Sequence, residues 1–186
     1  MSIVLQSSGG GQITIQEPAT ASNFTQTLPA ATGTVMVSGN QPAFSAKLSA
    51  NQNISNNTVT VLAANTEDFD TASCYNNTGS TVGGIPAYAF LPNIAGYYQI
   101  NFVLAEGGIA MSYNDSRINK NGSTYRFGTL YQPTSATYSA LYATGSAIIY
   151  MNGTTDYLQI AGYITASSSN NFDANSHWSG CLVRAA

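Results

Sequence analysis

Residues 90–104 read FLPNIAGYYQINFVL, and this stretch decides the fold class. A proline and a glycine precede two tyrosines, and from Tyr98 to Leu104 every second residue is large and apolar. Side chains of a β-strand alternate between its two faces, so the even-numbered residues from Tyr98 to Leu104 are predicted to share one buried face. The stretch therefore predicts a turn followed by a strand that borders a core.

Similar short runs of β-branched and aromatic residues recur along the chain, separated by Gly, Asn, Pro and Ser. No stretch has the 3.6-residue periodicity of a helix. The Asn-Gly pairs at 121–122 and 152–153 predict tight turns, because both residue types tolerate a positive φ. Further strands are predicted over residues 43–48, 58–62, 124–130, 136–142, 146–151, 157–164 and 178–183. This pattern is typical of an antiparallel sandwich or barrel.

Two of these runs, SAIIYM at 146–151 and YLQIAGYI at 157–164, are apolar on both faces. A single sandwich buries only one face of each strand, so the second face is predicted to meet a neighbouring sheet or subunit.

Residues 1–40 differ from the rest of the chain. They contain Gly9-Gly10-Gly11, a brief alternation at 12–16 and long runs of small residues, with few large apolar groups. Such a segment can hardly build a core of its own. We interpret it as an arm that contacts with partners hold in place, and we predict a globular domain at 41–186.

Composition excludes several classes of function. Only 7% of the residues are charged and the net charge is -3, which argues against nucleic acid as a partner, because phosphate binding needs clustered Lys and Arg. No apolar run reaches 18 residues, so no membrane span is predicted. The N-terminus lacks the pattern of a secretory signal, and we expect the initiator Met to mark a complete product. Cys74 and Cys181 form no CxxC pair and are predicted to be free thiols.

The sequence offers little for catalysis. His177 is the single histidine and lies beside Trp178, where we expect a structural role. No nucleophile elbow, HExxH, phosphate-binding loop or dinucleotide fingerprint is present, and no catalytic residue or cofactor is predicted. A sugar-active enzyme would need two positioned carboxylates, for which Glu106, Asp156 and Asp173 are the candidates.

The sequence also leaves two binding hypotheses open. Glu67, Asp68 and Asp70 form the densest acidic cluster, and the two aspartates could share a strand face and hold Ca²⁺, although carboxylates also cap turns. Asp173 is expected in a polar surface loop. Tyrosines with nearby amides could bind sugars or a protein, or could belong to the core and a subunit interface. These residues are Tyr113, Asn114, Asn121, Tyr125, Tyr131, Tyr138 and Tyr142.

A series of motifs follows in order from residue 42: PAFSAKL, NTEDFDTASCYNN, FLPNIAGYYQINFVL, RINKNGSTY, TGSAIIYMNGTTDYLQIAGY and HWSGCLVR. The series resembles the C1q/TNF-like domain in the form found in marine bacteriophage virion proteins, over about three quarters of the chain. Two departures from the family pattern are the NGTTD turn at 152–156 and the residues Trp178 and Cys181 in the last strand. The low-complexity stretch at 13–40 also resembles leader segments of phage fibre proteins.

The resemblance implies an all-β antiparallel jelly-roll β-sandwich with an extended N-terminal arm, assembled as a homotrimer. It implies a non-enzymatic surface protein of a tailed-phage virion, either capsid-decorating or the knob of a short head fibre, held to a capsid or tail protein through residues 1–40. The alternative is a receptor-binding tip of a tail fibre that binds host cell-surface glycans. The residues expected at the trimer interface are Tyr97, Val103, Ile148, Tyr150, Tyr157 and Tyr163.

Overall fold

The computed structural model describes residues 2–16, 19, 25, 30, 35, 37, 39, 41–108, 111–132, 140–166 and 170–186. The chain divides into two compact units, Met1–Gly33 and Thr34–Ala186. The predicted boundary, between 40 and 41, lies slightly later in the chain. Most of the predicted arm after residue 16 lies outside the described residues.

The first unit contains an antiparallel hairpin of β1 (Ser2–Gln6) and β2 (Gln12–Gln16). Its register pairs Ile3 with Ile15 and Leu5 with Ile13, which places four aliphatic side chains on one face of the hairpin. Each of the four is more than half exposed. The described part of this unit therefore has no buried core, as the sequence predicts.

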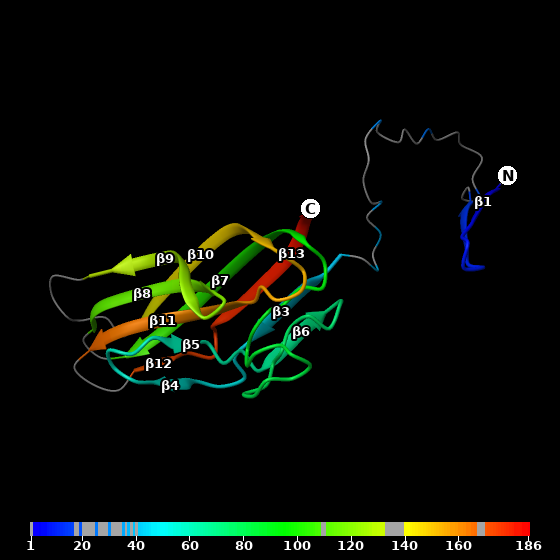
Figure 1. Cartoon of the computed structure of the whole chain (residues 1–186). Helices are drawn as coiled ribbons and strands as arrows, with labels where there is room; N and C mark the ends of the chain where they lie inside the picture. Colours follow the sequence, from blue (N-terminus) through cyan, green and yellow to red (C-terminus); the bar gives the residue numbers. More distant parts are fainter. Residues whose placement is uncertain are drawn as a thin grey trace. The chain divides into compact units, whose positions relative to one another are not determined.

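The described residues of the second unit form two antiparallel sheets (Figure 1). One has four strands in the order β5-β11-β8-β9, and the other has the order β4-β12-β7-β13-β3-β6 with β10 paired to the other edge of β7. The strands are β3 (Ala43–Lys47), β4 (Gln52–Ile54), β5 (Thr60–Val61), β6 (Thr66–Asp70), β7 (Gly96–Gly108), β8 (Met111–Lys120), β9 (Ser123–Tyr131), β10 (Ala140–Met151), β11 (Leu158–Ala166), β12 (Asn170–Phe172) and β13 (His177–Ala185). The prediction of an all-β antiparallel sandwich is confirmed.

Strand β7 is the central element, and it arises from the stretch at 90–104. Its even-numbered residues from Tyr98 to Leu104 are buried, as predicted. The Tyr98 hydroxyl donates to the backbone carbonyl of Ile94 at 2.7 Å, so a side chain of the strand stabilises the turn that precedes it. Phe90 packs edge-on against Tyr98, with ring centroids 5.4 Å apart. The motif therefore builds both the bend and the start of the core.

Aromatic rings fill the space between the sheets at one end of β7. Phe44 stacks on Tyr75 at 4.8 Å and on Phe90 at 4.6 Å, and it meets the edge of Trp178 at 4.5 Å. The Tyr75 hydroxyl donates to the carbonyl of Ala64 at 2.6 Å. Packed ring pairs stabilise a core beyond the area that they bury, and they join β3, β13 and the loop after β6.

The sheets also meet where β9 approaches β10. The Thr129 hydroxyl accepts the amide of Thr144 at 3.0 Å and donates to the Thr144 carbonyl at 3.1 Å. Gly128 and Gly145 lie against the ring of Phe102 at this seam, where a Cβ on Gly145 would lie 2.2 Å from the ring. Only glycines allow the two strands to come this close.

Both predicted turns are present. Asn121 and Gly122 have φ angles of 53° and 79°, and Gly153 has a φ of 74°. A Cβ on Gly153 would lie 2.4 Å from the amide nitrogen of Ala95, so glycine is required there for space as well as for conformation.

The predicted strand list needs two corrections. The runs at 146–151 and 136–142 are not separate strands, because Thr144 and Gly145 continue the ladder with Val103 and Phe102 within β10. Residues 136–139 of the second run lie outside the described residues. The prediction also missed β1, β4, β6, β8 and β12.

Candidate binding face of the seven-stranded sheet

The outward face of the seven-stranded sheet begins with an apolar end. Tyr97 of β7 pairs with Tyr150 of β10, and their ring centroids lie 5.6 Å apart. Ile148 follows on β10 and is paired with Gln99. Tyr97, Ile148 and Tyr150 are 45%, 59% and 43% exposed, which is unusual for large apolar side chains that lie next to one another on one surface.

Small uncharged polar residues cross the middle of this face. Ser146, Asn101, Ser179 and Ser45 stand side by side on four neighbouring strands. The Ser146 hydroxyl donates to Asn101 at 2.9 Å and accepts the Gln99 amide at 2.8 Å. Ser45 instead donates to Asp68 at 3.1 Å. A small hollow of about 180 Å³, bordered by Asn101, Ser179 and Cys181, lies in this uncharged centre. Phe69 of β6 continues the row and is 50% exposed.

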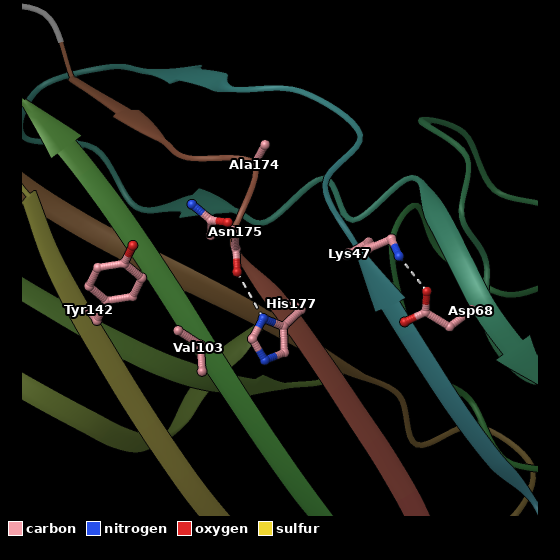
Figure 2. A pocket seen from close by; sticks show the side chains of 7 residues that line it. All are labelled: Lys47, Asp68, Val103, Tyr142, Ala174, Asn175 and His177. Carbon is pink, nitrogen blue, oxygen red and sulfur yellow. Dashed lines mark hydrogen bonds and ion pairs between the residues drawn. The ribbon is translucent and has the colours of Figure 1, made fainter.

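The far end of the face is hollowed (Figure 2). A hollow of about 520 Å³ is bordered by Tyr142, Val103, His177, Lys47 and Asp68, and by Ala174 and Asn175. The Lys47 ammonium lies 2.6 Å from Asp68, and the His177 ring nitrogen Nδ1 lies 2.8 Å from the carbonyl of Asn175. Hydrogen bonds from Lys47 and then from Ser45 hold the pKa of Asp68 below its usual value. The charged groups are therefore already paired, and the hollow presents a mixed apolar and polar surface.

Four of the six residues predicted at a subunit interface meet on this face: Tyr97, Val103, Ile148 and Tyr150. Tyr163 does not, because it lies on β11 in the other sheet, where it packs edge-on against Tyr113 at 5.8 Å. Tyr157 precedes β11, and its amide donates to the side chain of Asn121 at 2.9 Å. The structure thus divides the predicted set between the two sheets.

Sequence reasoning missed part of this face. Phe69 and Cys181 belong to it, and no sequence signal marks them: Phe69 lies within the acidic run of β6 and Cys181 is a single thiol in the last strand. Tyr142, predicted only as one of a set of possible binding tyrosines, also lies on this face. Both thiols are free, as predicted: Cys181 is exposed on this face and Cys74 is buried. Burial and the nearby Asp70 raise the pKa of the Cys74 thiol.

The four-stranded sheet carries a different outward surface. Arg117 donates through Nε to Asp115 at 2.7 Å, and its guanidinium lies 5.1 Å from the ring centre of Phe127 and 5.9 Å from that of Tyr163. Phe127 is 59% exposed. Aromatic faces beside a planar cation are suited to stacking on sugars or on another protein. Of the predicted tyrosine set, Tyr113, Tyr125 and Tyr131 belong to strands of this sheet.

The other members of that set are dispersed. Tyr142 lies on the opposite sheet, Asn114 is fully buried, and Tyr138 lies outside the described residues.

The carboxylates of the acidic cluster at 67–70 do not point to a common site. A bulge in β6 places Asp68 with Ser45 and Lys47, while Asp70 accepts the amides of Ala72 and Tyr75. Burial, followed by the charge of Asp70, raises the pKa of the neighbouring Glu67. Among the described residues, no three His, Cys, Asp or Glu side chains gather as a metal site. The two aspartates therefore do not share a strand face.

The three carboxylates considered for sugar chemistry occupy different environments. Asp156 pairs with Lys120 at 2.8 Å, Asp173 accepts the amide of Asn175 at 3.0 Å, and Glu106 is buried in the core. His177 begins β13 beside the buried Trp178. No helix in the part of the chain that the structure describes could span a membrane.

Comparison with solved structures defines the class of fold. The structure is similar to that of murine APRIL at pH 5.0, with a TM-score of 0.55 and 6% identity, over 77% of this chain and 99% of that one. It is also similar to Eiger TNF from S. frugiperda, with a TM-score of 0.50 and 10% identity, over 78% and 93% of the two chains. No protein-family model matches the sequence, and no curated protein matches it. The protein has a TNF-like jelly-roll fold, which confirms the fold that the resemblance implied.

Proposed function

We propose that the chain is a non-enzymatic, homotrimeric surface protein of a tailed-phage virion, a capsid-decorating protein or the knob of a short head fibre. Residues 1–40 attach it to a capsid or tail protein in this proposal. The observation that carries the assembly is the outward face of the seven-stranded sheet, where large apolar side chains flank an uncharged centre.

This face has the features of a subunit interface. Interfaces are enriched in aromatic residues and depleted of charge at their centre, and Tyr97, Tyr150 and Phe69 stand around a centre of serines and amides. Paired charges, Lys47 and Asp68, lie toward the rim. The resemblance to C1q/TNF-like domains implies three copies around an axis rather than two.

The N-terminal hairpin supports attachment to a partner. Its exposed face of Ile3, Leu5, Ile13 and Ile15 is an apolar surface that the described part of its own unit does not cover. Such a surface is stabilised when another protein removes it from water.

A pair of matched substitutions tests the assembly. Ile148 and Phe127 are both 59% exposed, but Ile148 lies on the proposed interface and Phe127 lies on the other sheet. Light scattering after size-exclusion chromatography should give the molar mass of three chains for the wild type and for Phe127→Glu, and that of one chain for Ile148→Glu. A wild type that stays monomeric at micromolar concentration would disprove the trimer.

Cys181 supplies a second measurement because it is an exposed thiol on this face while Cys74 is buried. Its alkylation in the native wild type should be about tenfold slower than in Ile148→Glu, since a trimer shields the face. Equal rates would mean that the face is open in solution.

The attachment is tested on purified particles. Particles of the parent phage should contain this polypeptide, and particles that lack it should assemble but lose surface density or stability. Its absence from purified virions would end the proposal.

The aromatic surface around Arg117 favours a second candidate, a receptor-binding module for host cell-surface glycans. Phe127→Glu should then abolish binding of the isolated protein to host cells or glycan arrays while Ile148→Glu affects assembly. Wild-type protein that binds no cells and does not block adsorption would count against this candidate.

A further inference from the structure

Three buried carboxylate and amide side chains at one end of the sandwich have no hydrogen-bond partner among the residues that the structure describes. Both carboxylate oxygens of Glu106, and both side-chain polar atoms of Asn114 and of Asn170, lack one. The three residues are 1%, 0% and 3% exposed. Buried polar groups are almost always satisfied in native proteins, so a group of this kind points to an ion or to water.

The strand register brings the three residues to one end of the sandwich. Glu106 follows Leu104 on the inward face of β7, and its Oε1 lies 3.1 Å from the position that a Cβ on Gly162 would occupy. The carboxylate therefore reaches across the core to β11. Gly162 pairs with Ser116, and Asn114 stands two residues away on the same face of β8.

Asn170 enters the same region from β12. Phe172 is paired with Glu106 and Asn170 with Gly108, so Asn170 is the diagonal neighbour of Glu106 on the inward face. Amide and carboxylate oxygens from three strands and both sheets thus face one part of the core.

The charge of Glu106 favours a bound cation at this cluster of three side chains. An unpaired carboxylate in a core is strongly disfavoured, and burial, followed by the charge of Asp115, raises the pKa of Glu106 to about 9. Asp115 offers no positive charge, and its own partner is Arg117. A proton would neutralise Glu106, but none of the three side chains is hydrogen-bonded to another, so both amide oxygens would still lack donors. A cation between them would bind the carboxylate and both amide oxygens together, whereas the two amide NH₂ groups are donors and would face away from it.

We infer that Glu106, Asn114 and Asn170 form an internal oxygen-ligand site for a hard cation of the Ca²⁺ class, which links the two sheets. Ca²⁺ accepts carboxylate and amide oxygens and completes its coordination with water or backbone carbonyls. The site is distinct from the acidic cluster at 67–70, and it does not depend on the proposed function.

The test uses the full chain with Ca²⁺ and Tb³⁺ as probes. After treatment with EDTA, CaCl₂ at about 100 times its Kd should raise the Tm by about 5–10 °C, because it binds the folded state alone. Tb³⁺ should give luminescence sensitised by the aromatic residues, and Ca²⁺ should displace it. Glu106→Gln should lose both responses, and Asp68→Asn, which removes a surface carboxylate, should keep both.

A gain-of-function variant covers the case in which Glu106→Gln does not fold. Asn170→Asp adds a second carboxylate and should tighten Ca²⁺ binding by about tenfold or more. The inference is overturned if the wild type shows neither a Ca²⁺-dependent Tm nor Tb³⁺ luminescence, if Glu106→Gln keeps the responses, or if Asn170→Asp does not strengthen them. Loss of the responses in Asp68→Asn alone would place the ion at the surface instead.

Discussion

Gly145 shows how a single residue controls the approach of the two sheets. In Gly145→Ala the added methyl would lie 2.2 Å from Cε1 of Phe102 and 3.3 Å from the Cα of Gly128, so the ring and the seam must move. We expect a loss of about 1–3 kcal/mol in the free energy of unfolding, measured by urea denaturation. Gly39→Ala is the control, because its methyl meets nothing within 4 Å. Equal stabilities for the two variants would show that the seam can relax.

Asp156 is a second single residue with a measurable effect, a pH-dependent contribution to the free energy of unfolding. Burial alone would raise the pKa of Asp156, but hydrogen bonds from Lys120, Asn121 and the backbone of Asn152 outweigh burial and lower it from 3.8. A carboxyl group with a lowered folded pKa stabilises the protein above its unfolded pKa, and this stability is lost as the pH falls through the folded pKa.

Asp156→Asn should therefore cost about 1 kcal/mol at pH 7, a modest value because the group lies near solvent. The difference from the wild type should shrink steadily as the pH falls below about 4. Denaturation curves between pH 2 and pH 7 measure it. A difference that stayed constant over this range would refute the assignment.

At the scale of elements, the contact between β9 and β10 depends on one side chain. Thr129→Val keeps the shape but removes the hydroxyl that bonds the amide and the carbonyl of Thr144. Leaving these groups unsatisfied should cost about 1–3 kcal/mol and should speed hydrogen exchange of the Thr144 amide by about tenfold or more. Thr124→Val on the exposed part of β9 is the control. Unchanged protection of Thr144 would mean that the seam is held in another way.

The strands also show where sequence patterns succeed and where they fail. β7 was predicted with the correct buried face, because its inward residues are uniformly large and apolar from Tyr98 to Leu104. β8 was missed because its inward positions include Asn114 and Ser116, so the alternation that marks a strand is absent. β6 was missed for a similar reason, since its acidic residues suggested an ion site rather than a sheet edge.

The same reasoning explains the candidate site. Tyr97, Ile148 and Tyr150 could be predicted, because apolar residues on both sides of a strand indicate a second buried face. The same pattern includes Tyr163, which lies on the other sheet, since the pattern cannot tell which sheet a strand joins. That assignment depends on the pairing of β11 with β8, which is set by contacts between distant parts of the chain.

At the scale of the whole molecule, the two units should be separable. The core, from Phe44 to Trp178, is built entirely within the second unit, and the hairpin side chains of the first unit are exposed. Deleting residues 1–33 should therefore change the Tm of the remaining chain by less than about 2 °C, measured by calorimetry, because little buried apolar area is lost. The deleted chain should also keep its oligomeric state, since Ile148 and its neighbours remain.

The deletion should leave the fold intact but abolish attachment of the protein to the particle. If the apolar face of the hairpin docks on the particle, the full chain should cosediment with particles that lack the native polypeptide. The truncated protein should not cosediment with them. Replacing Ile3 and Ile15 with Ser in the full chain is the matched test, because these two residues pair across the hairpin face and their loss leaves the second unit untouched. Truncation that lowers the Tm by more than about 5 °C would show that the first unit supports the fold of the second. Truncation that leaves cosedimentation intact would instead place the docking surface on the jelly roll itself.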